Sequence, residues 1–157
     1  MLPQFRKTNA VLVSMLPMAH MYGLMFEFLF EMSVGAHVHF LTRVPAPKII
    51  MEAFAAVKPT LIISVPLIIE KIYKKQIQPL LDKITVKALL KLPIIDRVLL
   101  NKIADRLNNV FGGRFIEIIV GGAAFSKDAE KFFKRIGFRY TVGYGMTECA
   151  PIISYCG

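Results

Sequence analysis

Apolar residues in this chain follow two patterns, short continuous runs and longer stretches with helical spacing. Runs of about six apolar residues between turn signals are typical of buried strands. Residues 10–16, 60–65 and 115–120 are mainly apolar runs of this kind, and the apolar or β-rich segments 36–41 and 138–142 also read as strands. The run at residues 60–65, TLIISV, is strongly β-branched, which favours a strand over a helix. The pattern therefore predicts five strands.

The stretches between these runs predict helices. Residues 24–34 place Glu27 and Glu31 four positions apart on one helical face. Four further helices are expected, because prolines or a capping Ser126 mark their starts and prolines or glycines mark their ends. They run from after Pro45 and Pro47 up to Pro59, from Pro66 to a stop before Pro79, from Pro93 to Gly112 and Gly113, and from Ser126 to Gly137. Residues 83–92 stay unassigned.

Strands and helices alternate along the whole chain. This alternation predicts an α/β fold, a mainly parallel sheet with helices on both faces. A length of 157 residues is that of one domain with a real core. Ligands of such sheets bind beyond the carboxyl ends of the strands. We therefore expect three loops to share one sheet edge: Pro17–Gly23, Gly121–Phe125 and Gly143–Glu148.

The last of these loops, GYGMTE, carries the most suggestive chemistry. The ring of Tyr144 can stack on a base, and Gly145 lets the backbone bend or approach a ligand closely. Thr147 can donate to a phosphate oxygen, and Glu148 can hold Mg²⁺ through oxygen. The other reading is a surface turn with a capping threonine and a solvated glutamate. Alone, the motif leaves both open.

The two other loops are also ambiguous. GGAAF, Gly121–Phe125, allows backbone to approach a base or phosphate and offers N–H donors, but a tight turn also needs glycine. His20 suits a pocket wall, a phosphate contact or a substrate gate, and equally a buried, satisfied imidazole. His37 and His39 share a strand face without further ligands, so no transition metal is expected. Cys149 is expected to be a small buried thiol rather than a nucleophile.

Composition and charge narrow the class of protein. Hydrophobic residues make up 55% of the chain and the net charge is +9. Ten Lys or Arg and three Asp lie between residues 71 and 114, a basic helical segment. It has few aromatic residues, which disfavours nucleic-acid binding. Two readings of this segment stay open: peripheral contact with an anionic membrane surface, or an ordinary exterior helix with a solvated face.

Neither a membrane span nor a secretory signal is expected. The most apolar stretch, residues 11–41, is interrupted by charged residues, histidines, glycines and a proline. The two cysteines have no zinc-site spacing, and a reduced cytoplasmic compartment fits them best.

Three motifs together, LPMAHMYG at residues 16–23, GGAAF and GYGMTE, resemble those of the adenylate-forming (AMP-binding) superfamily. The chain is most similar to long-chain fatty acyl-CoA synthetases, and the resemblance covers nearly its whole length. It implies a large N-terminal α/β domain followed by a small mobile domain. Residues 1–157 would then be one partial domain, a middle segment of the N-terminal part.

The resemblance also implies a two-step reaction and a set of residue roles. A fatty acid carboxylate attacks the α-phosphate of ATP–Mg²⁺ to give acyl-adenylate and pyrophosphate, and coenzyme A then displaces AMP. Tyr144 would stack on the adenine, Thr147 would bind phosphate, Glu148 would hold Mg²⁺, and His20 would lie near the pyrophosphate and the mouth of the acyl pocket. The nucleotide-binding positions implied are Gly121, Gly122, Ala123, Ala124, Gly143, Tyr144, Gly145, Met146 and Thr147.

Other parts of the family's site are expected outside this sequence. They are the phosphate loop with its lysine, the aspartate that holds the ribose, and the C-terminal lysine for adenylation. We therefore expect the 157 residues alone to be inactive, and to dimerise through exposed sheet edges. The alternative function is a non-catalytic basic α/β module that docks on a membrane surface or a protein partner.

Overall fold

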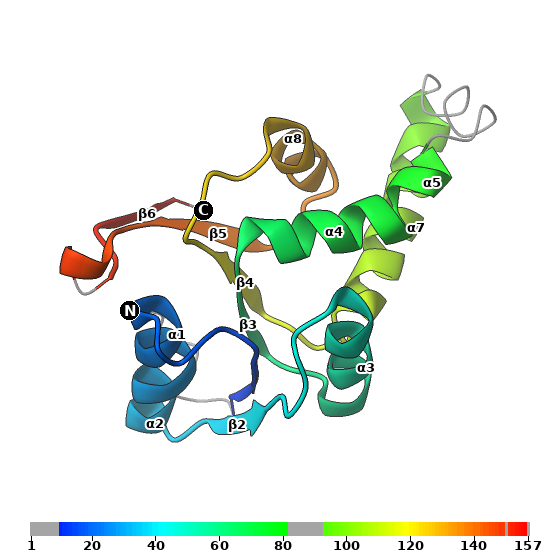
Figure 1. Cartoon of the computed structure of the whole chain (residues 1–157). Helices are drawn as coiled ribbons and strands as arrows, with labels where there is room; N and C mark the ends of the chain where they lie inside the picture. Colours follow the sequence, from blue (N-terminus) through cyan, green and yellow to red (C-terminus); the bar gives the residue numbers. More distant parts are fainter. Residues whose placement is uncertain (1–9, 82–92, 150, 157) are drawn as a thin grey trace.

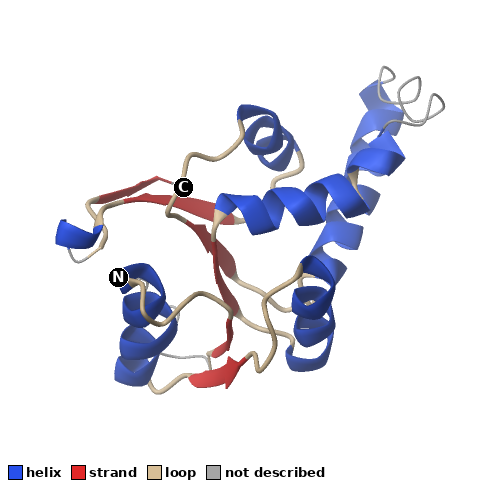
Figure 2. Cartoon of the chain, viewed as in Figure 1, coloured by secondary structure: helices blue, strands red, loops and turns tan. Residues whose placement is uncertain are grey.

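Among the described residues, six strands form one sheet that lies between helices on both sides (Figure 2), and the strand order is β2-β1-β3-β4-β5-β6. The computed structural model describes residues 10–81, 93–149 and 151–156. The first five strands are parallel, and the last pairs antiparallel with β5. Their bounds are β1 Val11–Ser14, β2 His37–Phe40, β3 Leu61–Ser64, β4 Glu117–Val120, β5 Tyr140–Tyr144 and β6 Ser154–Cys156.

One face of the sheet is covered by α3, α4, α7 and α8 (Figure 1). These helices span Pro47–Val57, Pro66–Gln76, Pro93–Val110 and Lys127–Arg135, and the short α5, Gln78–Leu81, follows α4. Their apolar stripes bury Phe54, Ile72, Leu107 and Phe133 against the strands. Because these four side chains are at most 1% exposed, this layer forms the main core.

The opposite face carries one continuous helical segment made of α1, η2 and α2. Its parts are Met21–Gly23, a π-helical stretch Leu24–Leu29, and Phe30–Val34, which ends at Gly35 in the left-handed conformation. Leu12 of β1 and Leu61 and Ile63 of β3 pack against it in a second, smaller core cluster with Leu16 and Tyr22.

The predicted α/β fold with a mainly parallel sheet and helices on both faces is confirmed, and several boundaries were wrong. The helix expected from Leu24 begins at Met21, because the His20 side chain caps it. The helix expected from Pro66 does stop before Pro79, since α4 ends at Gln76, but the short helix α5 that follows was not predicted. Pro79 lies in the first turn of α5, where its missing N–H costs nothing. The strand predicted at residues 138–142 runs on to Tyr144, and β6 was not predicted.

Ser126 is the residue before α8, but its side chain makes no capping hydrogen bond, and its N–H donates to Glu70 Oε1 at 2.8 Å instead. Residues 83–92, left unassigned from sequence, lie outside the described residues. Within the described ranges no helix is long and apolar enough to cross a membrane.

Candidate active site

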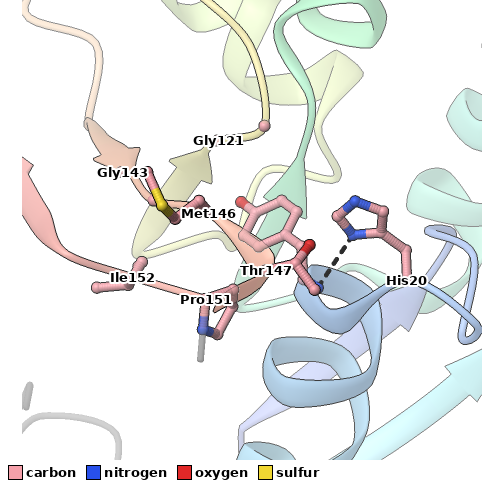
Figure 3. A pocket seen from close by; sticks show the side chains of 10 residues that line it. His20, Gly121, Gly143, Met146, Thr147, Pro151 and Ile152 are labelled. Carbon is pink, nitrogen blue, oxygen red and sulfur yellow. Dashed lines mark hydrogen bonds between the residues drawn. The ribbon is translucent and has the colours of Figure 1, made fainter. Parts of the chain in front are cut away.

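A pocket of about 130 Å³ lies at the carboxyl ends of β4 and β5, beside the turn that follows β1 (Figure 3). All three loops expected at this edge contribute to it, so their predicted convergence is confirmed. The lining residues are His20, Tyr22, Gly121, Gly122, Gly143, Gly145, Met146, Thr147, Pro151 and Ile152. Parallel strands bring these distant segments together because each strand ends at the same side of the sheet.

His20 stands at the start of α1 and is exposed at the pocket. Its Nδ1 accepts a hydrogen bond from the Tyr22 N–H at 3.1 Å. This bond satisfies a free N–H of the first helical turn, and it favours the tautomer with a proton on Nε2. The imidazole is therefore oriented by the backbone while its side chain remains accessible, which rules out the buried-core alternative.

Tyr22 forms the floor of the pocket and was not predicted as a site residue. Its hydroxyl donates toward the carbonyl oxygens of Ser64 at 3.3 Å and Ile119 at 3.5 Å. Burial, and secondly the negative charge of Glu27, raises the pKa of Tyr22, so the phenol stays neutral. A Cβ on Gly121 would lie 3.0 Å from the ring and hydroxyl of Tyr22. The first glycine of GGAAF therefore makes room for this tyrosine.

The GGAAF loop differs in one respect from its prediction. The Gly121 N–H donates to the Ser64 carbonyl at 3.0 Å, so it is used within the sheet and is not free for a ligand. Gly122 has a φ of +85°, a conformation that favours glycine. Gly122 lines the pocket, whereas Ala123 and Ala124 are exposed beyond its lining.

GYGMTE forms the connection of the hairpin between β5 and β6. Tyr144 ends β5, and its carbonyl accepts from Ile153 N–H at 2.9 Å. Gly145 lies so close to the Pro151 backbone that a Cβ would overlap the Pro151 carbonyl oxygen. What approaches this glycine closely is thus the returning chain. A single 3₁₀ turn, η3 (Thr147–Cys149), completes the connection.

The hairpin distributes its side chains between the pocket and solvent. Thr147 and Met146 line the pocket. Tyr144 is 62% exposed and Glu148 is exposed on the same turn as Thr147, so both are outside the lining. Cys149 was predicted to be buried, and this prediction was wrong: the thiol is exposed because η3 projects from the sheet edge.

The oxygen-bearing side chains that the structure describes at this edge do not make up a complete metal site. Among the described residues, no group of three or more His, Cys, Asp or Glu side chains could hold a metal by itself. Mg²⁺ commonly binds through one or two carboxylates together with substrate phosphates and water. Glu148, with Thr147 one residue away, offers this kind of partial ligand set.

Fold and pocket together define an α/β protein with a candidate ligand site of glycine-rich loops at the sheet edge. The family of AMP-binding enzymes matches residues 2–157, and the chain belongs to that family. Long chain acyl-CoA synthetase 6, peroxisomal, of Arabidopsis thaliana is 32% identical over 94% of this chain and 22% of its own length. Long chain acyl-CoA synthetase 3 of the same plant is 28% identical over 88% of this chain and 23% of its own.

Solved structures show the same fold at lower identity. The A-PCP didomain of carboxylic acid reductase from Segniliparus rugosus, in complex with AMP, has a TM-score of 0.70 and 23% identity over 93% of this chain and 19% of its own. A benzoate CoA ligase from Burkholderia xenovorans has a TM-score of 0.64 and 20% identity over 94% of this chain and 24% of its own. The chain therefore spans about a fifth to a quarter of the proteins it matches.

Proposed function

We propose that this chain is part of an ATP-dependent long-chain fatty acid–CoA ligase and carries part of its adenylate site. The names of the two plant relatives support the substrate class. In the proposed reaction a fatty acid carboxylate attacks the α-phosphate of ATP, which releases pyrophosphate. The thiol of coenzyme A then attacks the acyl-adenylate, which yields the thioester and AMP.

The observation that carries this proposal is the meeting of three distant loops at one pocket. Thr147 and His20 lie on two of these loops and would contact the phosphates. Tyr144, at the end of β5, would stack on the adenine that passes along Gly122, Ala123 and Ala124. Glu148 would hold the Mg²⁺, whose charge would offset that of the phosphates. Positioned donors of this kind stabilise the charge that builds up on the phosphoryl oxygens.

No general base is needed in the first step, because a substrate carboxylate is ionised at neutral pH. The chain's own task is thus to bind and orient nucleotide and acid. Glycine-rich loops around the pocket suit this task, and it does not require a buried catalytic dyad. The phosphate loop, the ribose aspartate and the adenylation lysine implied by the family resemblance would come from further segments. We accordingly expect the 157 residues alone to form no acyl-CoA from fatty acid, ATP, Mg²⁺ and coenzyme A.

The proposal is tested by fatty-acid-dependent exchange of pyrophosphate into ATP in the full-length protein. Glu148→Ala and Tyr144→Ala are expected to abolish exchange. Glu52→Ala on α3 and Tyr155→Ala on β6 are matched controls, since Glu52 is an exposed carboxylate far along the chain and Tyr155 is 72% exposed. Full exchange in both site variants would overturn the proposal.

A second candidate function, a basic module that docks on a membrane or a protein partner, is favoured by the exposed Lys71, Lys74 and Lys75 along α4. An anionic bilayer attracts such a face. The same experiment separates the two candidates, because a docking module would lose nothing on Glu148→Ala. Sedimentation with vesicles of phosphatidylserine and phosphatidylcholine, before and after replacing the three lysines by glutamine, tests the docking directly.

A further inference from the structure

The buried carboxylate of Glu27 holds the end of β1. Glu27 Oε2 accepts hydrogen bonds from Ser14 Oγ at 3.0 Å, Met15 N at 3.0 Å and Leu16 N at 2.8 Å. The Glu27 side chain is fully buried. The two backbone donors follow directly after the last residue of the strand, where the ladder no longer pairs them. One side chain thus replaces the lost strand partner at this point.

The helix that carries Glu27 has an unusual geometry at the same position. Glu27 lies within the π-helical stretch η2, between α1 and α2. π-Helical turns are rare, and they occur frequently at functional sites. Here the wider π-helical turn contains Glu27, the residue whose carboxylate reaches the end of β1. The local backbone and the hydrogen bonds therefore point to the same role for this residue.

Hydrogen bonds continue from this anchor to His20. Leu16, bound by Glu27, is followed directly by Pro17, whose carbonyl accepts from His20 N–H at 3.0 Å. The His20 ring in turn accepts from Tyr22 N–H. The turn between β1 and α1 is therefore fixed at its start by Glu27 and at its end by the helix that also carries Glu27.

We propose that Glu27 is a positioning residue, which sets the β1–α1 turn and thereby places His20 at the adenylate pocket. This inference rests on the proposed function of that pocket. Glu27 itself is covered by protein and does not line the pocket. Its effect on the reaction would therefore pass entirely through the backbone of Met15 and Leu16 and through the turn they begin.

The test is a double-mutant cycle in the full-length protein, with fatty-acid-dependent ATP–pyrophosphate exchange as the readout. Glu27→Ala removes the acceptor of all three donors and is expected to lower exchange about 10- to 100-fold, because a misplacement of about 1 Å can cost that much. His20→Ala is expected to lower it similarly, and the double variant to lower it no further. If the two losses multiply, the residues act independently and the proposal is overturned.

Rescue and a matched control separate positioning from general stability. Glu27→Gln keeps an acceptor oxygen for the three donors, and exchange is expected within about threefold of the wild type, at saturating substrates. Glu31→Gln changes a second buried carboxylate of the same helical segment, which has no hydrogen-bond partner among the described residues. It is expected to leave exchange unchanged. A loss in Glu31→Gln equal to that in Glu27→Ala would refute the specific role.

A second readout does not depend on activity. In protein labelled with ¹³C at the histidine Cε1, the His20 signal, assigned by its disappearance in His20→Ala, is expected to shift in Glu27→Ala and to stay in place in Glu31→Gln. An unshifted signal in folded Glu27→Ala would overturn the positioning role. A wild-type protein without exchange but with this shift would instead refute the proposed function and leave the positioning intact.

Discussion

The hydroxyl of Tyr22 lies 3.3 Å from the carbonyl oxygen of Ser64, the last residue of β3. The Tyr22 hydroxyl oxygen is also 3.5 Å from the carbonyl oxygen of Ile119 in β4. A side chain from the first pocket loop therefore bridges the carboxyl ends of two adjacent parallel strands. Because Gly121 leaves space for the ring, the second loop is shaped around the first.

Removing this hydroxyl tests how strongly the bridge holds the loops. Tyr22→Phe keeps the ring and is expected to lower the free energy of unfolding by about 1 kcal/mol, the usual value for one neutral hydrogen bond. The loss stays small because Ser64 keeps its bond from the Gly121 N–H. Urea denaturation measures it, with Tyr155→Phe as the control. Equal stability of Tyr22→Phe and the control would show that the bridge contributes nothing.

Two glycines of the pocket are expected to respond differently to alanine. Gly122→Ala places a Cβ in ordinary van der Waals contact with Val65, at 3.6 Å, and costs only the strain of its positive φ, about 1–3 kcal/mol. Gly145→Ala must displace the backbone of Pro151 and Ile152. It is therefore expected to cost more and to speed amide exchange across β6, which Gly122→Ala would leave protected. Equal protection of β6 in both variants would contradict this account.

Much of the fold could be predicted from sequence because its signals are local. Continuous apolar runs such as Leu61–Ser64 and proline-led helices such as Pro66–Gln76 specify their own structure. The sheet edge that carries the site followed from topology alone. The antiparallel β6 could not be predicted, since Ser154–Cys156 has no strand pattern and, among the described strands, pairs with β5 alone.

The site was predictable as a location and less so as a set of contacts. His20, Gly122 and Thr147 were expected and line the pocket. Tyr22 and Glu27 were missed as site residues because their importance lies in partners far along the chain, Ser64 and the end of β1. The one available signal was that Glu27 and Glu31 share a helical face with apolar neighbours, which brings carboxylates into a core.

The free edge of β2 leads us to expect self-association of the isolated 157 residues. Among the described strands β2 pairs only with β1, and His37, His39 and Phe40 along it are exposed. Phe40→Lys places a charge on this edge and is expected to reduce the dimer fraction measured by light scattering. Val98→Lys on α7 is the control, since both side chains are 54% exposed. A wild-type monomer at all concentrations would exclude edge pairing.

The buried pair Glu27 and Glu31 predicts that stability falls as pH rises. Burial raises the pKa of both carboxyls to about 7, and the charge of Glu27 adds to the rise at Glu31. At pH values between the ordinary pKa of a glutamate and about 7, these carboxyls keep their protons in the folded state and lose them in the unfolded state. The stabilisation is complete at the acid end of this range and is lost as pH rises through about 7. Its size is on the order of a few kcal/mol.

Glu31→Gln separates this effect from other titrations, because the amide occupies the same volume and cannot ionise. Urea denaturation between pH 5 and pH 8 is expected to show a shallower decline in this variant than in the wild type, with the variant more stable at pH 8. Glu52→Gln, an exposed carboxylate 4.0 Å from Lys48, is expected to keep the wild-type slope. Glu31 is the sharper probe of the two buried carboxyls, since no hydrogen-bond donor in the described part of the chain reaches its oxygens. An unchanged slope in Glu31→Gln would mean that this carboxyl does not retain its proton in the folded protein.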